Sequence, residues 1–149
     1  MTLLIAFLVA LAPAAPAANP LAGLSPDSVA SVLVTRIVVP RISRYSSTDV
    51  NADVSFAGER CTLDRADAGA FAAAAGRARP LTRRRRRVEA GLAIAVRLDD
   101  GQAIGVIVGA RAIYGDVDRS TIMIEGQFYT LDRRSLRAMR AVMARCSFE

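Results

Sequence analysis

Two cysteines are the residues of this sequence whose chemistry follows most directly from their number and spacing. Cys61 and Cys146 are the only cysteines among 149 residues. A small chain that reaches an oxidising compartment pairs its cysteines by default, and such a bond stabilises a fold by roughly 2–4 kcal/mol. The sequence therefore predicts a Cys61–Cys146 disulfide, with two unpaired thiols as the alternative.

A run of arginines is the second chemical feature. Residues 77–87 hold seven arginines and no acid, namely Arg77, Arg79, Arg83, Arg84, Arg85, Arg86 and Arg87. Guanidinium groups suit phosphate and carboxylate, so the run predicts a contact with a polyanion such as anionic lipid, lipopolysaccharide or an acidic protein. A solvated linker and a site of trypsin-like cleavage are the alternatives. Nucleic acid is disfavoured, because the run contains no aromatic residue on which bases stack.

Catalytic and metal chemistry finds little support. The chain has no histidine, which excludes Ser-His-Asp and Cys-His sites and removes the commonest metal ligand. Asp99 and Asp100 suit a hairpin turn, and Asp116 and Asp118 lack the further oxygen ligands that calcium requires. We therefore expect a protein that is not an enzyme and that uses no metal or cofactor. An enzyme working with carboxylates would need at least two convergent acids in a pocket.

The first 17 residues have the features of a signal peptide. An apolar stretch from residue 3 to residue 11 is followed by small residues and prolines, and Ala15-Pro16-Ala17 fits the small-x-small cleavage rule. The stretch is too short to span a bilayer, which takes about 20 residues. No lysine or arginine precedes it, which departs from the usual pattern. Residues 1–17 are thus predicted to be a signal peptide, and an uncleaved anchor is the alternative.

Residues 18–149 are then expected to form a single exported domain, periplasmic or secreted, with no transmembrane segment. All of the net charge of +6 belongs to this part, because the predicted signal peptide carries no charged side chain. Every basic residue is an arginine. A composition rich in alanine and arginine and free of lysine is typical of a bacterial genome with high GC content. Arginine counts therefore carry reduced weight as functional evidence.

Two similar octets, GERCTLDR at residues 58–65 and GQFYTLDR at residues 126–133, lie 68 positions apart. In each copy a β-like stretch precedes the octet and an apolar stripe at helical spacing follows it. Asp64 and Asp132 are in the right place to cap these helices, because a short carboxylate accepts hydrogen bonds from the free N–H groups of a first turn. The octets therefore predict pseudo-repeat halves at about 29–79 and 91–146, joined by an arginine-rich linker at 80–90.

The expected fold is α+β. It is a mostly antiparallel sheet built from two pseudo-repeated β-rich units, each followed by one helix, with both helices on one face. Asp-Gly between the apolar runs 91–98 and 102–110 predicts a hairpin. If a pseudo-twofold axis relates the halves, a Cys61–Cys146 bond implies an equivalent contact between Tyr129 and Ala78, since each lies 68 positions from one cysteine.

The function expected from these features is binding. The sequence predicts a small exported bacterial protein, non-enzymatic, that contacts an acidic envelope or extracellular partner through its basic segment. The alternative is a secreted or periplasmic interaction or inhibitor module that docks on a partner protein by an exposed strand or loop. The two differ in salt dependence, because polyanion binding weakens steeply with ionic strength and docking by shape does not.

Overall fold

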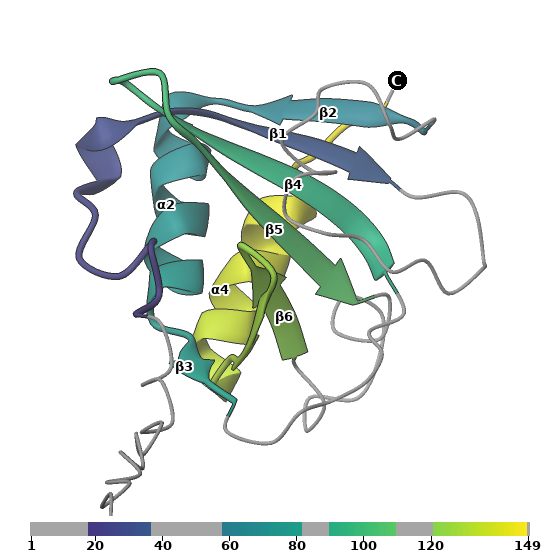
Figure 1. Cartoon of the computed structure of the whole chain (residues 1–149). Coiled ribbons are helices and arrows are strands. Elements are labelled where there is room, and N and C mark those ends of the chain that lie inside the picture. The colour runs from purple at the N-terminus through teal and green to yellow at the C-terminus, as the bar shows by residue number, and fades with distance from the viewer. Residues whose placement is uncertain (1–17, 37–57, 82–89, 110–120, 149) are drawn as a thin grey trace, which may run out of the picture.

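The computed structural model describes residues 18–36, 58–81, 90–109 and 121–148. In chain order its elements are the 3-10 helix η1 (Pro26–Ser28), β1 (Val29–Arg36), β2 (Arg60–Leu63), α2 (Arg65–Gly76), β3 (Arg79–Pro80), β4 (Ala90–Leu98), β5 (Ala103–Gly109), β6 (Thr121–Ile124), β7 (Gln127–Thr130) and α4 (Arg133–Met143) (Figure 1). The predicted signal peptide, residues 1–17, and the arginines at 83–87 lie outside the described residues.

Within the described segments, all strands belong to one sheet in the order β2-β1-β4-β5-β6-β7-β3. Every neighbouring pair in the sheet is antiparallel. The prediction of an α+β fold with a mostly antiparallel sheet is therefore confirmed. The predicted hairpin is formed by β4 and β5, and Gly101 in its turn has a φ of +86°, a conformation that glycine adopts without strain.

Both helices begin at the aspartates expected to cap them. The Asp64 carboxylate accepts a hydrogen bond of 2.8 Å from the backbone N–H of Asp67 at the start of α2. The Asp132 carboxylate accepts one of 2.7 Å from the N–H of Ser135 at the start of α4. Each cap satisfies one of the N–H groups that a first helical turn leaves without a partner.

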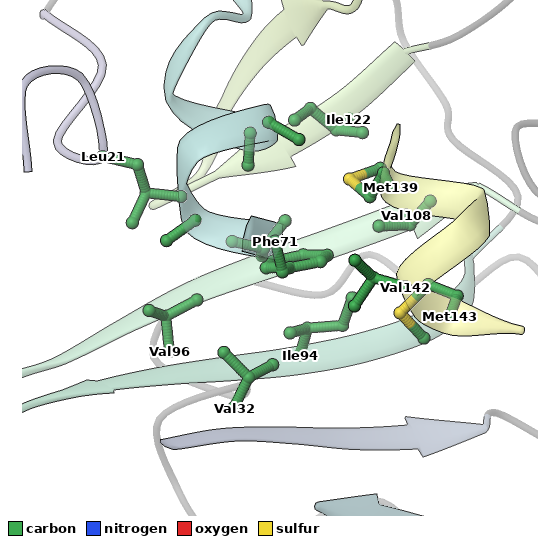
Figure 2. Packing of buried hydrophobic residues seen from close by; sticks show 14 of the residues in the cluster. Leu21, Val32, Phe71, Ile94, Val96, Val108, Ile122, Met139, Val142 and Met143 are labelled. Atoms are coloured by element: carbon green, nitrogen blue, oxygen red, sulfur yellow. The ribbon is translucent and has the colours of Figure 1, made fainter. Parts of the chain in front are cut away.

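The two helices and the sheet enclose one core. Alternate residues of a strand share a face, and the cluster takes such residues from several strands, including Val32 and Val34 of β1 and Ile94 and Val96 of β4. The helical members of the cluster are Ala68, Phe71, Ala72, Ala74 and Ala75 of α2 and Leu136, Met139, Val142 and Met143 of α4. Figure 2 shows Phe71 directed from α2 toward strand residues Ile94 and Val108. The helix made mostly of alanine thus relies on one large side chain for its packing.

A short N-terminal segment closes the C-terminal end of α2. The Asn19 side-chain amide is buried and donates to the carbonyls of Ala75 at 3.0 Å, Gly76 at 3.2 Å and Ala78 at 3.2 Å. Leu21, two residues on, is 1 % exposed. At Gly76 a Cβ atom would lie 2.5 Å from the Leu21 carbonyl oxygen, so this segment approaches the helix where glycine leaves room for it.

The predicted disulfide is present. Cys61 in β2 is bonded to Cys146 beyond the end of α4, across a sequence separation of 85, with Cα atoms 5.7 Å apart. The bond ties the segment that follows the last helix to an edge strand of the sheet. Cys61 itself is buried in the core cluster.

Candidate functional site

The arginine run begins at the end of α2. Arg77 caps the helix and Arg79 lies in β3, and both side chains are exposed. The arginines at 83, 84, 85, 86 and 87 lie outside the described residues. Only the first two of the seven predicted binding residues are therefore placed by the structure.

Strand β3 brings this run beside the start of α4. It forms one edge of the sheet and pairs with β7, so that Arg79 lies opposite Thr130. The cap of α4 follows Thr130 by two residues, and the exposed side chains of Arg133, Arg134 and Arg137 come from the first turns of that helix. We call the set of Arg77, Arg79, Arg133, Arg134 and Arg137 the basic edge.

Three members of the basic edge were not among the predicted binding residues. Arg133, Arg134 and Arg137 stand more than 50 positions from Arg79 in the sequence, and the β3–β7 pairing brings the start of their helix to the end of the sheet where β3 lies. Their positions off the apolar stripe of α4 indicate exposure, which the structure shows. No local pattern indicates that they lie near the arginine run.

A hydrogen bond joins the end of α2 to the start of α4 at the basic edge. The Arg77 Nε–H donates to the Ser135 hydroxyl at 3.1 Å. The pKa of Asp132 lies below its usual 3.8, first because the Ser135 backbone N–H donates to the carboxylate, then because the Ser135 hydroxyl does, and also because Arg77 is nearby. The cap of α4 is therefore held in its charged form by the same residues that connect the helices.

This shift predicts a pH dependence of stability. The folded state holds the Asp132 proton more weakly than the unfolded state, so its contribution is complete above the unfolded pKa and is lost as pH falls through the lower folded value. Asp132→Asn keeps a capping oxygen but does not titrate. In urea titrations, the advantage of the native protein over Asp132→Asn should shrink as pH is lowered from about 5 to about 2. A difference that stays constant over this range would contradict the assignment.

A cavity of about 350 Å³ lies at the opposite end of α4. It opens where β1 ends and β4 begins. Among the described residues, its lining includes Arg36, Leu92, Arg140, Met143, Ala144, Cys146 and Phe148. Sequence reasoning missed this site, because its lining residues come from three separate parts of the chain and none belongs to the arginine run.

Arg36 is held in place by two contacts at the edge of the cavity. One terminal nitrogen of its guanidinium contacts the Glu59 carboxylate at 2.6 Å, and the group lies over the Phe148 ring, 4.2 Å from its centre. Its Nε atom is buried and has no hydrogen-bond partner within the part of the chain that the structure describes. An unpaired buried donor is uncommon in folded proteins and costs free energy.

The described segments hold no group of three or more histidine, cysteine, aspartate or glutamate residues that could bind a metal ion. None of their helices has both the length and the apolar character needed to cross a membrane.

Comparison with known proteins adds no relative to this description. No protein-family model matches the chain, and no curated protein or solved structure matches it. The basic edge and the cavity beside Arg36 and Arg140 are the candidate functional features of the described residues.

Proposed function

We propose that this chain is an exported, non-enzymatic binding protein that contacts an acidic partner in the envelope or outside the cell. The contact surface is the basic edge, continued along the chain by the arginines at 83–87. The observation that carries the proposal is the pairing of Arg79 with Thr130, since it joins the arginine run to the arginines at the start of α4. The disulfide supports export, because such bonds persist mainly in oxidising compartments.

The position of these arginines on α4 also favours an anionic partner. Arg133 and Arg134 occupy the first turn, where the partial positive charge of the helix N-terminus disfavours cations. An anion bound at this edge would offset that repulsion and accept hydrogen bonds from exposed guanidinium groups. Anionic lipid, lipopolysaccharide and an acidic protein surface all supply such groups.

The alternative function, docking on a partner protein by an exposed strand, gains less from this edge. Strand β3 contains only Arg79 and Pro80, and Pro80 has no N–H to donate to an added strand. A short edge strand with proline and charge is typical of edges that resist strand addition. The alternative could still take the form of docking by a loop. Salt dependence would distinguish it, because polyanion binding weakens steeply as salt is added.

The pseudo-repeat is part of the same proposal, and contacts between the helices support it. Arg77 contacts Ser135 at 3.1 Å, and Arg145 contacts Asp67 at 3.0 Å. Arg145 lies 68 positions after Arg77, and Asp67 lies 68 positions before Ser135. A twofold axis that exchanges α2 with α4 would produce this matched pair of contacts.

The register of the sheet supports the same axis. In the first half, Val34 of β1 lies between Cys61 of β2 and Ile94 of β4. In the second half, Ile122 of β6 lies in the same way between Tyr129 of β7 and Val108 of β5. Tyr129 also pairs with Pro80, two residues from Ala78, and both Tyr129 and Ala78 are buried. A location of both helices on one face is supported by the single core cluster that contains residues of α2, α4 and alternate strand positions.

Binding to anionic vesicles tests the proposed function. We expect the oxidised protein to bind vesicles of phosphatidylglycerol, or vesicles carrying lipopolysaccharide, at low ionic strength and to release them as salt is added. A basic residue near an anionic membrane contributes about 1 kcal/mol. The double variant Arg79→Ala/Arg134→Ala should therefore bind about 30-fold more weakly in a sedimentation assay.

The matched control removes the same charge elsewhere. Arg60 and Arg97 are exposed, and they lie in β2 and β4, away from the edge that β3 forms. The double variant Arg60→Ala/Arg97→Ala should lose much less affinity than the basic-edge variant. The proposal fails if the protein does not bind at low salt, if neutral phosphatidylcholine vesicles bind equally well, or if both double variants weaken binding equally.

A further inference from the structure

We infer that the cavity at the C-terminal end of α4 is a second binding site, which takes a small amphiphilic anion: a carboxylate carried on a short apolar chain. The cavity is separate from the basic edge, which lies at the other end of the helix, but the comparison below with the end of α2 rests on the proposed pseudo-repeat.

The lining combines the two chemistries that such a ligand needs. Leu92, Met143 and Phe148 supply apolar surface, and Arg36 and Arg140 supply guanidinium groups. Small-molecule sites are concave and mostly apolar, with a few polar groups that fix the orientation of the ligand, and a volume near 350 Å³ is within their range. A carboxylate is the head group that guanidinium binds with charge-assisted hydrogen bonds.

Arg36 is held in place at the edge of the cavity. Glu59 occupies one of its terminal nitrogens and the Phe148 ring covers its guanidinium plane. These contacts hold the side chain in place, yet the buried Nε–H lacks an acceptor among the described residues. Because that Nε is fully buried, a ligand oxygen in the cavity would meet the terminal part of the guanidinium, whose position the contacts with Glu59 and Phe148 fix.

The corresponding end of α2 is filled by the protein itself. Ala75, Gly76 and Ala78 correspond by the 68-residue match to Met143, Ala144 and Cys146 of the cavity lining. At α2 these residues are contacted by the Asn19 amide and approached by the buried Leu21. One polar group and one apolar chain of leucine size thus complete that end of the fold. The cavity is the counterpart of this position, and the inferred ligand has the same two parts.

Arg36 and Arg140 differ from the residues that occupy the corresponding positions in the other half of the proposed repeat. Ala72 stands 68 positions before Arg140 and is buried in the core. Ile124 pairs with Val106 as Arg36 pairs with Leu92, and Ile124 is 0 % exposed. Both corresponding positions therefore hold apolar residues, and the arginines occur only at the end of α4 where the cavity lies.

Calorimetric titration of the full oxidised chain with octanoate tests the inference. We expect octanoate to bind and uncharged octanamide, of equal size, to bind at least tenfold more weakly. Arg140→Ala and Arg36→Ile install the residues of the equivalent positions and should each weaken octanoate binding about tenfold or more. Arg137→Ala removes the same charge one turn away, outside the cavity lining, and should leave the affinity within about twofold.

Amide NMR shifts locate the site and guard against unfolded variants. Octanoate should move the signals of Ala144 and Phe148, and it should do so equally in the basic-edge variant Arg79→Ala/Arg134→Ala, which separates this site from vesicle binding. The inference is overturned if octanoate leaves those signals unmoved, if octanamide binds as tightly, or if Arg137→Ala weakens binding as much as Arg140→Ala. Should Arg36→Ile fail to fold, the Arg140→Ala and Arg137→Ala pair decides the matter.

Discussion

Replacing Phe71 with alanine should lower the free energy of unfolding by about 3–5 kcal/mol, the cost of removing a fully buried aromatic side chain. Phe71 is 0 % exposed, and the other buried residues of α2 are alanines and a glycine. The alanines of α2 are too short to fill the space that Phe71 leaves, so a cavity remains between helix and sheet. Since small domains are stable by about 5–15 kcal/mol in all, this one change removes a large share.

Urea unfolding at equilibrium measures the effect, with Phe71→Leu as the matched control. Leucine keeps most of the apolar volume and should cost less than half as much as alanine. A loss below about 1 kcal/mol for Phe71→Ala would mean that α2 does not depend on this residue for its packing. The two helices could then not be packed as Figure 2 shows them.

Loss of the disulfide should have the second largest effect. The bond closes a sequence separation of 85, and removing it should cost about 2–4 kcal/mol by releasing the unfolded chain from that constraint. For a domain of this size the melting temperature should fall by about 7–15 °C. Cys61→Ala/Cys146→Ala is the variant of choice, because alanine places no hydroxyl at the buried Cys61 position.

Reduction provides the independent comparison. Dithiothreitol should lower the melting temperature of the native protein by about the same amount and leave that of the double variant unchanged. Equal melting curves for the native protein with and without reductant would contradict a stabilising role of the bond. Both measurements use circular dichroism, since the chain has no tryptophan to report on its folding.

Local patterns in the sequence were sufficient to predict the helix caps, the β4–β5 hairpin and the disulfide. Asp64 and Asp132 cap their helices as predicted because capping depends on residues within one turn. The hairpin depends on Asp-Gly between two apolar runs, and the disulfide on there being only two cysteines. None of these features needs knowledge of distant neighbours.

Strand order could not be predicted in this way. A constant offset of 68 residues aligns the two octets with each other. The same offset aligns β5, and not β6, with the region that begins at Thr35. In the sheet, Val34 lies opposite Cys61 and Ile122 lies opposite Tyr129. Under the proposed pseudo-repeat, which relates β1 to β6, the offset is 88 at this strand. The connection between β1 and β2 is longer than the turn between β6 and β7, and length differences in connections leave no periodic signal.

The candidate sites were the least predictable part. Arg36 and Arg140 are separated by more than 100 residues, and they line one cavity because β1 ends where α4 ends. Ile124 and Ala72, their counterparts under the proposed pseudo-repeat, are apolar and buried and give no hint of it. The basic edge depends in the same way on β3, a strand of two residues that no sequence pattern would identify.

The pairing of β3 with β7 and the bond from Cys61 to Cys146 have a consequence for cleavage in the arginine run. Both connections join residues before position 82 to residues after position 90. A protease that cut between Arg83 and Arg87 would therefore produce two fragments held together by one covalent bond and by a shared sheet. Cleavage there would yield a two-chain protein, and the molecule would stay in one piece.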